Sequence, residues 1–346
     1  MNLFDYLDKN CKETFSIRHP LNEIDAMILS RFSYLPLDQI KLRKVESVGT
    51  IAKKIENVAM RHYIWPEDRR LIMKMANTKR YRDLPVFGFE KRANKRTVEQ
   101  FSAVSIYLPG GTIAVSYTGT DSTLNGWRED CNMAIFETIP SQKSAKKYLK
   151  TIAHMYADFD IVLVGHSKGG TLSMYAVATA KKEIRDRIKM VYSFDGPGLS
   201  EKFSDKIPKF VVNYIPQDSF VGRLLNHAEK TEVVRSNAKL LFQHNVYSWD
   251  VSLKSNRLIR TTISKKSDLA DRAVRRWVKN STREEKEEFI DLIFKVLEDS
   301  QVGTPNDIAK AGASVIPKII ESYRRLKKTD RKMLFKMAKI FLWPDD

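Results

Sequence analysis

The stretch "DIVLVGHSKGGTLSMYAVATA", residues 160–180, decides the fold of this 346-residue chain. A short apolar run, Ile161 to Val164, leads into a tight Gly-x-Ser-x-Gly turn, and a helical pattern of small residues follows. A strand that delivers a serine to the N-terminus of a helix places the hydroxyl at the edge of a sheet, where free N–H groups can stabilise an oxyanion. We therefore predict that Ser167 is a catalytic nucleophile. The alternative is an ordinary serine in a sharp turn.

The composition describes a folded and strongly basic protein. Hydrophobic residues make up 42% of the chain, enough for a core, and 60 Lys and Arg against 42 Asp and Glu give a net charge of +18. This charge favours polyanions, either nucleic acid or an anionic membrane surface, although a solvated basic surface explains it equally well. With two distant cysteines, no signal-like N-terminus and no long apolar run, we expect a cytoplasmic protein, soluble or peripheral.

Strand and helix patterns alternate along most of the chain. Residues 22–85 have mostly helical spacing, and an amphipathic helix is expected over 141–159. The strand patterns are "LPVFGFEKR", "QFSAVSIYL", "TIAVSYTG", "KMVYSF", "KFVVNYI" and "TEVVRS", besides the run before Ser167. Alternation of this kind predicts an α/β fold with a mainly parallel sheet. Beyond residue 252 the strand signal stops, and 265–343 has the pattern of four helices. We therefore expect one domain over 1–252, with a possible lid at 41–80, and a basic helical extension over 253–346.

A nucleophilic serine needs a histidine base and an acid that orients it, in the chain order Ser, acid, His for this architecture. Only two of the six histidines follow Ser167. His227 lies in a helical pattern and fits a surface or capping role. His244 lies in a loop-like setting after a strand pattern, so it is the predicted base.

Two aspartates are candidates for the acid. Asp218 follows the strand pattern "KFVVNYI" and is preferred. Asp195 ends the preceding strand, although the Pro and Gly after it suggest that it shapes a turn, and it stays open as the alternative. The oxyanion donors are expected to be the backbone N–H groups of Lys168 and Thr120.

Several motifs together resemble the class 3 lipases. Residues 117–120, Tyr-Thr-Gly-Thr, followed by Asn125-Gly126-Trp127 and Asp130, look like the Phe-Arg-Gly-Thr/Ser and Asn-Trp-x-x-Asp patterns of that family, and "GHSKGG" is similar to its Gly-His-Ser-Leu-Gly-Gly elbow. The likeness covers roughly residues 86–252, and the Lys variant of the elbow brings the chain closest to an allied bacterial family of unknown function. The resemblance implies an α/β-hydrolase fold, to which the helical patterns add a helical N-terminal region and a helical C-terminal extension. It also implies the roles given above for Ser167, Asp218, His244 and Thr120.

The sequence departs from the lipase pattern at two positions. Thr118 stands where the family has arginine, which predicts that a buried charge partner is absent. Lys168 stands where the family has leucine, and its side chain could contact the helix surface, a nearby acidic group or an anionic substrate. Trp127 is expected in the core and Asp130 as a structural hydrogen-bond partner. We expect no metal and no cofactor, because ligand spacings and nucleotide motifs are missing.

The predicted function is a serine hydrolase that cleaves a carboxylic ester, in particular a lipid or acyl ester, through an acyl-enzyme. The alternatives are a catalytically silent hydrolase scaffold and a basic protein that binds membranes or polyanions, without a specific nucleic-acid motif. Residues 318–339 carry nine basic and two acidic side chains. With an apolar stripe of Met333, Leu334, Met337, Ile340 and Phe341, the segment 318–341 could contact an anionic membrane or pack on the main domain.

Overall fold

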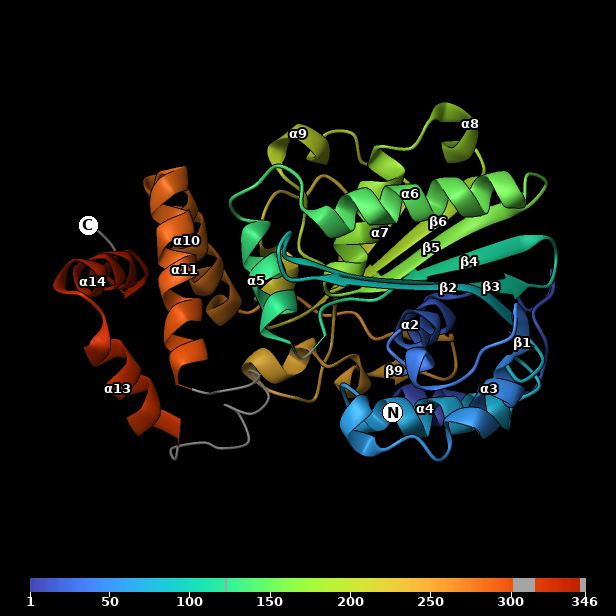
Figure 1. The fold of residues 1–346 in the computed structure, drawn as a ribbon. Coiled ribbons are helices and arrows are strands. Elements are labelled where there is room, and N and C mark those ends of the chain that lie inside the picture. The colour runs from blue at the N-terminus through green and yellow to red at the C-terminus, as the bar shows by residue number, and fades with distance from the viewer. Residues whose placement is uncertain (122, 301–314, 343–346) are drawn as a thin grey trace.

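An eight-stranded sheet forms the centre of the computed structural model, which describes residues 1–121, 123–300 and 315–342 (Figure 1). The strands lie in chain order and are β1 Val45–Ser47, β2 Pro85–Asn94, β3 Glu99–Leu108, β4 Thr112–Tyr117, β5 Asp160–His166, β6 Ile188–Phe194, β7 Val211–Pro216 and β8 Lys230–Val234. Strands β1 to β4 pair antiparallel, whereas β4 to β8 pair parallel. All the predicted strands are present, and the predicted α/β class with a mainly parallel sheet is confirmed.

Helices cover both faces of the sheet. The helices are α1 Leu3–Asn10, α2 Glu23–Phe32, α3 Val48–Ile55, α4 Pro66–Ala76, α5 Leu124–Asn132, α6 Pro140–Met155, α7 Lys168–Ala178, α8 Lys182–Arg185, α9 Glu201–Ser204, α10 Lys265–Asn280, α11 Arg283–Asp299, α13 Ile316–Arg325 and α14 Lys328–Leu342. Short 3-10 turns are η1 Leu37–Gln39, η2 Met60–His62, η3 Val221–Arg223, η4 Leu240–His244 and η5 Val246–Ser248. Helices α6 and α7 lie on one face of the sheet and α1 to α4 on the other (Figure 1). Each layer contributes its own buried apolar cluster against the sheet.

The segment 41–80, where a lid was expected, is built into this second layer. Strand β1 extends the sheet through β2, and helices α3 and α4 pack on each other. Their apolar faces are fully buried: Val48, Ile51, Ile55, Leu71, Ile72 and Met75. Because these side chains are part of the core, moving the segment as a lid would expose the underside of the sheet. The structure therefore gives most of 41–80 a core role in place of a lid.

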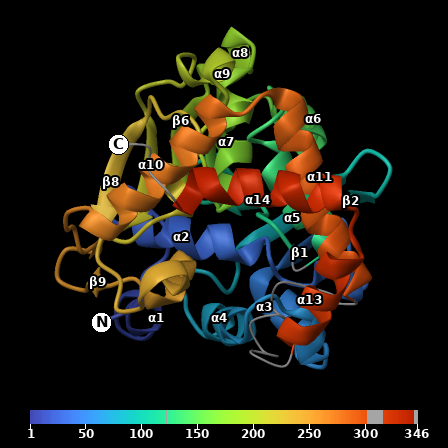
Figure 2. The same cartoon turned by 90° about the vertical axis from the view of Figure 1, so that its left-hand side faces the viewer.

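The C-terminal extension stands at the edge where the parallel strands end. Figure 2, which views that edge, shows α10, α11 and α14 in front of the sheet, and α5 lies behind α11. Buried Trp277, Ile290, Phe294 and Met337 form an apolar cluster with side chains of α5. The boundary expected after residue 252 divides a small hairpin, β9 Val251–Ser252 with β10 Arg257–Leu258, so the helical part starts only at α10.

The predicted tail stripe has two different surroundings. Met337 is fully buried against α10 and α11, while Phe335 is 67% exposed. The side chains of Ile340 and Phe341 lie outside the described residues, as does the whole segment 301–314 of the four-helix prediction. Of the helices that the structure describes, none combines the length and the apolar character that crossing a bilayer requires.

Candidate active site

Ser167 sits on a strained turn between β5 and α7. Its backbone has φ 57° and ψ −134°, a conformation that side-chain-bearing residues seldom adopt. The turn closes because its glycines carry no Cβ: a Cβ at Gly165 would lie 2.1 Å from the carbonyl oxygen of Gly169, and one at Gly169 would lie 2.2 Å from that of Tyr117. The predicted strand–serine–helix elbow is therefore the observed local structure. It leaves Ser167 at the N-terminal end of α7, beside unpaired helical N–H groups.

His244 comes to this edge of the sheet from η4. Its ring lies 4.5 Å from the ring of His166, the neighbour of Ser167, and its carbonyl oxygen is 2.8 Å from Nε2 of His166. Its Nδ1 is 2.6 Å from Oδ2 of Asp195, which is almost fully buried. The carboxylate of Asp195 is itself held, because Oδ1 accepts hydrogen bonds from the Ser219 hydroxyl at 2.5 Å and from a backbone N–H at 3.1 Å.

The partner of His244 thus differs from the aspartate preferred on sequence grounds. Asp218 contacts Gln243 instead: its N–H donates to Oε1 at 3.0 Å, and its Oδ2 accepts from Nε2 at 2.8 Å. The reason lies in the strand order, because β6 is the direct neighbour of β5 whereas β7 is one strand further away. Neighbouring strands are about 4.8 Å apart. Asp195, which follows the last residue of β6, therefore reaches His244. Asp218 lies beyond the end of β7 and contacts Gln243, the residue before His244.

The loop after β4 approaches the elbow as predicted. A Cβ at Gly119 would lie 3.1 Å from Cβ of Ser167 and 2.5 Å from the carbonyl oxygen of His166, so only glycine allows this contact. The Thr120 hydroxyl donates to Asp130 and thereby ties this loop to α5. Asp130 has the expected structural role.

Lys168, the residue after Ser167, is fully buried and contacts an acidic group. Its Nζ is 2.9 Å from Oε2 of Glu129 and 3.5 Å from Oδ1 of Asp130, and it donates to Oε1 of Gln100 at 2.7 Å. Burial disfavours the ammonium, but Asp130 and Glu129 outweigh this and raise the pKa of Lys168 above its usual range. The loop is tied to the same cluster, because Nε2 of Gln100 donates to the carbonyl oxygen of Gly119 at 3.3 Å.

This cluster corrects the expectation attached to Thr118. A buried charge partner is not absent: the cation comes from Lys168, at the position where the class 3 lipases have leucine. Thr118 is buried, and its hydroxyl donates to the carbonyl oxygen of Ser33 at 2.8 Å.

A second buried ion pair contacts His166, the residue before Ser167. Arg31 of α2 and Asp68 of α4 pair at 2.7 Å with no exposure of either side chain. Nη1 of Arg31 lies 3.3 Å from Nδ1 of His166, and the Tyr34 hydroxyl lies 3.0 Å from it. Because the carbonyl of His244 only accepts, Nε2 of His166 carries the proton and Nδ1 is an acceptor. Burial, His244 and Arg31 all lower the pKa of His166 well below 6.5, so this ring is neutral.

Two remaining sequence expectations have clear outcomes. His227 lies in the loop between η3 and β8, so the helical setting expected for it is wrong, and its ring contacts Glu229 at 2.6 Å and the carbonyl of Leu224 at 2.8 Å. Trp127 was expected in the core but is 44% exposed, because it lies on the outer side of α5. Within the described ranges, no group of three or more His, Cys, Asp or Glu side chains could hold a metal ion.

A mainly parallel sheet whose central strand leads through a strained serine turn into a helix defines a lipase-like α/β-hydrolase. Residues 75–295 match the model of the Mbeg1-like family, and the chain belongs to that family. No protein with a curated description matches the sequence.

Solved structures of lipases show a distant likeness. A fungal lipase has 13% identity and a TM-score of 0.44 over 74% of this chain and 92% of its own. The M37 lipase has 12% identity and a TM-score of 0.41 over 93% and 98%. Lip2 lipase from Yarrowia lipolytica has 11% identity and a TM-score of 0.39 over 73% and 88%.

The sequence did not predict the contacts among Arg31, Asp68 and His166, since no pattern links residues of α2 and α4 to the elbow.

Proposed function

We propose that the protein is a serine hydrolase of carboxylic esters, with lipid or acyl esters as the substrate class. The observation that carries the proposal is the 2.6 Å contact between Nδ1 of His244 and Oδ2 of Asp195 beside the strained turn of Ser167. A histidine oriented by a buried carboxylate at a serine elbow is the arrangement that activates a hydroxyl for attack.

The proposed reaction has two half-steps. Nε2 of His244 takes the proton of the Ser167 hydroxyl while the oxygen attacks the ester carbonyl, and Asp195 stabilises the imidazolium that forms. The N–H groups of Thr120 and Lys168 donate to the oxyanion of the tetrahedral intermediate. The alcohol leaves with the proton from His244, and an acyl-enzyme remains on Ser167. Water activated by His244 then attacks this ester, the carboxylic acid leaves, and the hydroxyl of Ser167 is restored.

The N–H donors are proposed to be held in place by the Lys168 cluster. Lys168 is pinned by Glu129 on one side of the nucleophile, and the loop that carries Thr120 is tied to Gln100 and Asp130. Oxyanion donors are effective only when they are positioned before charge develops. The buried lysine thus supplies rigidity to both donors without contacting the substrate.

The experiment that tests this function is hydrolysis of p-nitrophenyl esters with acyl chains of increasing length. We expect turnover by the wild type and loss of it in Ser167→Ala, with Ser173→Ala as the matched control because Ser173 lies six positions further on in α7 and donates to the carbonyl of Gly169. Turnover that is equal in wild type and Ser167→Ala would reject Ser167 as the nucleophile, and no turnover by the wild type would leave the silent scaffold as the better account.

A second proposal is peripheral contact with an anionic membrane through α13. Ile316, Ile320 and Tyr323 lie on one face of α13, and their side chains are 50%, 43% and 37% exposed. Exposed Arg324 borders this face, while exposed Lys318 and Arg325 lie on the opposite, polar side of the helix, where Arg325 pairs with Glu321. An exposed apolar stripe beside lysine and arginine is typical of helices that lie in the membrane interface. The proposed contact is therefore on α13, within the segment 318–341 and just before it, while α14 packs inward through Met337.

We further propose that the protein works in the cytoplasm. Cys11 and Cys131 are both free thiols, and burial raises the pKa of each to about 12. Thiols that are protonated in this way are poor nucleophiles, as expected of cysteines with a packing role in a reducing compartment.

A further inference from the structure

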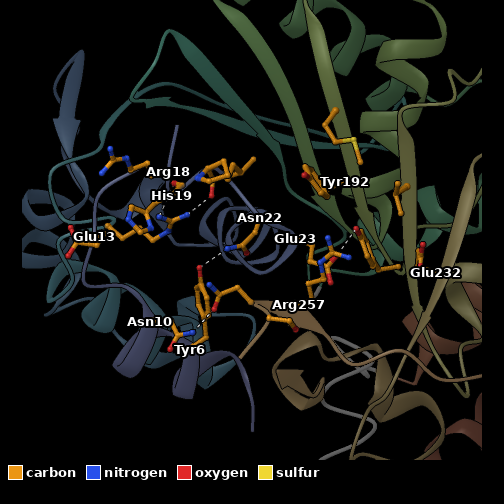
Figure 3. Close-up of a pocket in the computed structure, with 18 of the residues that line it drawn as sticks. Tyr6, Asn10, Glu13, Arg18, His19, Asn22, Glu23, Tyr192, Glu232 and Arg257 are labelled. Carbon is orange, nitrogen blue, oxygen red and sulfur yellow. Dashed lines mark hydrogen bonds between the residues drawn. The ribbon is translucent and has the colours of Figure 1, made fainter. Parts of the chain in front are cut away.

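We propose that a basic cavity beneath strands β6 to β8 is a binding site for an organic phosphate, separate from the site of Ser167. The cavity has a volume of about 860 Å³. Pockets that hold small organic ligands range from about 300 to 1,000 Å³. Its walls come from α1, from the segment between α1 and α2, from β6 to β8 and from the β9–β10 hairpin (Figure 3).

The floor of the cavity is apolar and aromatic. Met190 and Tyr192 of β6 and Val212 and Tyr214 of β7 line it, and the two tyrosine rings are stacked 6.4 Å apart at 14°. Tyr192 is half-buried, and among the described residues its hydroxyl has no hydrogen-bond partner. A surface of this kind can cover the apolar or aromatic body of a ligand and offers it one hydroxyl.

The strand-side wall is neutralised by its own contacts. Both oxygens of Glu23 are occupied: Arg260 donates to them at 2.8 and 2.7 Å, the Tyr214 hydroxyl donates at 3.1 Å, and a backbone N–H of β10 donates at 2.6 Å. Glu232 pairs with Arg260 at 2.7 Å and also with Lys230. These acids therefore leave no free negative charge in the cavity that would repel an anion.

The rim has an excess of free positive charge. Lys9, Lys12, Arg18 and Arg257 line the cavity and are exposed, and none of them has an ion pair within the described part of the chain. Among the lining residues that the structure describes, Glu13 is the one acid that opposes them on the rim. The walls that carry these cations are tied together, because Nδ2 of Asn10 donates to the carbonyl oxygen of Leu253 at 2.7 Å. Cations on three separate segments are thus held around one opening.

This arrangement fits a phosphate better than a single carboxylate. A phosphate monoester carries close to two negative charges and three oxygens that accept hydrogen bonds, so it can engage cations from several directions. Arginine in particular binds phosphate through two parallel N–H donors. The ligand class is therefore a phosphate monoester with an apolar or aromatic body, whether a nucleotide or a lipid.

The cavity shares no residue with the candidate active site. Helix α2 lies between the two, with Glu23 at one end facing the cavity and Arg31 near the other end beside His166. At 1.5 Å per residue, the eight positions between them span about 12 Å. Binding in the cavity is thus expected to be independent of the Ser167 hydroxyl.

The test is a fluorescence titration of the full-length protein with 1-naphthyl phosphate. We expect one saturable site per chain in the wild type and in Ser167→Ala. The variant Lys12→Glu/Arg18→Glu/Arg257→Glu is expected to weaken binding by about tenfold or more, since each exposed charge contributes modestly. The control Lys143→Glu/Lys147→Glu/Lys150→Glu makes the same charge change on exposed positions of α6 and is expected to change affinity less than about twofold.

Two results of the titration would overturn the proposal: no saturable binding to the wild type, or equal weakening in the rim variant and the α6 control, which would assign binding to net charge alone. Competition separates the two sources of phosphate. Displacement of the probe by AMP supports a nucleotide, and displacement by dihexanoyl phosphatidic acid supports a lipid. Displacement by neither would contradict the site. Because binding is expected to be retained in Ser167→Ala, the phosphate site and the proposed hydrolase activity are tested independently.

Discussion

Lys168 Nζ lies 2.9 Å from Glu129 Oε2, and neither side chain has any exposure to solvent. The residue directly after the candidate nucleophile is thereby fixed to α5 through a buried ion pair. Removing one partner of such a pair leaves an uncompensated charge in the interior, which is far more costly than removing both. We therefore expect the stability of the fold to depend on a lysine at position 168 as long as Glu129 is present.

We predict that Lys168→Met destabilises the fold by about 3–5 kcal/mol, because Glu129 is left buried without its cation. The double variant Lys168→Met/Glu129→Gln is expected to recover a large part of this loss. Urea unfolding of the wild type, the two single variants and the double variant measures the coupling between the two side chains. Additive losses in the double variant would show that the ion pair does not act as a unit.

Replacing the two candidate aspartates separates their roles. Asp195→Asn is expected to lower kcat by about 10²–10⁴-fold, because the amide no longer stabilises the imidazolium of His244. Asp218→Asn keeps an acceptor for Gln243 and is expected to change kcat by no more than about threefold. Ester hydrolysis by both variants decides between them. A larger loss for Asp218→Asn would restore the assignment made from the sequence.

His166 predicts a particular pH dependence of stability. Its pKa is well below 6.5 in the folded protein, so below pH 6.5 the unfolded chain binds a proton that the folded chain does not. Stability is thus fully present above pH 6.5 and falls as the pH drops, by up to about 1.4 kcal/mol per pH unit. The variant His166→Gln lacks this contribution. The difference in unfolding free energy between wild type and variant, measured from pH 7.5 to 5, should shrink toward acid, and a constant difference would contradict the buried neutral ring.

The vesicle contact proposed for α13 has a matched control on the same chain. Ile316→Ser/Ile320→Ser/Tyr323→Ser should weaken binding to vesicles that contain phosphatidylserine by about tenfold or more, because apolar area is lost. The control replaces Ile17, Met60 and Met155 with serine, since these are also exposed but lie elsewhere. Co-sedimentation with vesicles measures both. An equal loss in the two variants would speak against a specific role of α13.

Much of this fold follows from local patterns in the sequence. The strand–serine–helix turn at Ser167 could be predicted from the apolar run before it and the glycines after it, because such a turn depends on neighbours in the chain. His244, which the structure places beside the elbow, could be singled out because only two histidines follow the serine.

The choice between Asp195 and Asp218 was not accessible in this way. It depends on which strand lies next to β5, and that is a property of the sheet. The ion pairs of Lys168 with Glu129 and of Arg31 with Asp68 join residues 39 and 37 positions apart, a distance at which spacing carries no signal. Trp127 was misplaced for a related reason, because an aromatic side chain on a short helix gives no indication of which face is covered.

The central claim is that Ser167 is an activated nucleophile, and covalent labelling with a serine-directed fluorophosphonate tests it most directly. Such probes react with hydroxyls that a base has activated, and unactivated serines do not react. We predict labelling of the wild type on Ser167, located by peptide mass spectrometry, with no labelling of Ser167→Ala and strongly reduced labelling of His244→Ala. An unlabelled wild type, or a label that persists in Ser167→Ala, would contradict the account.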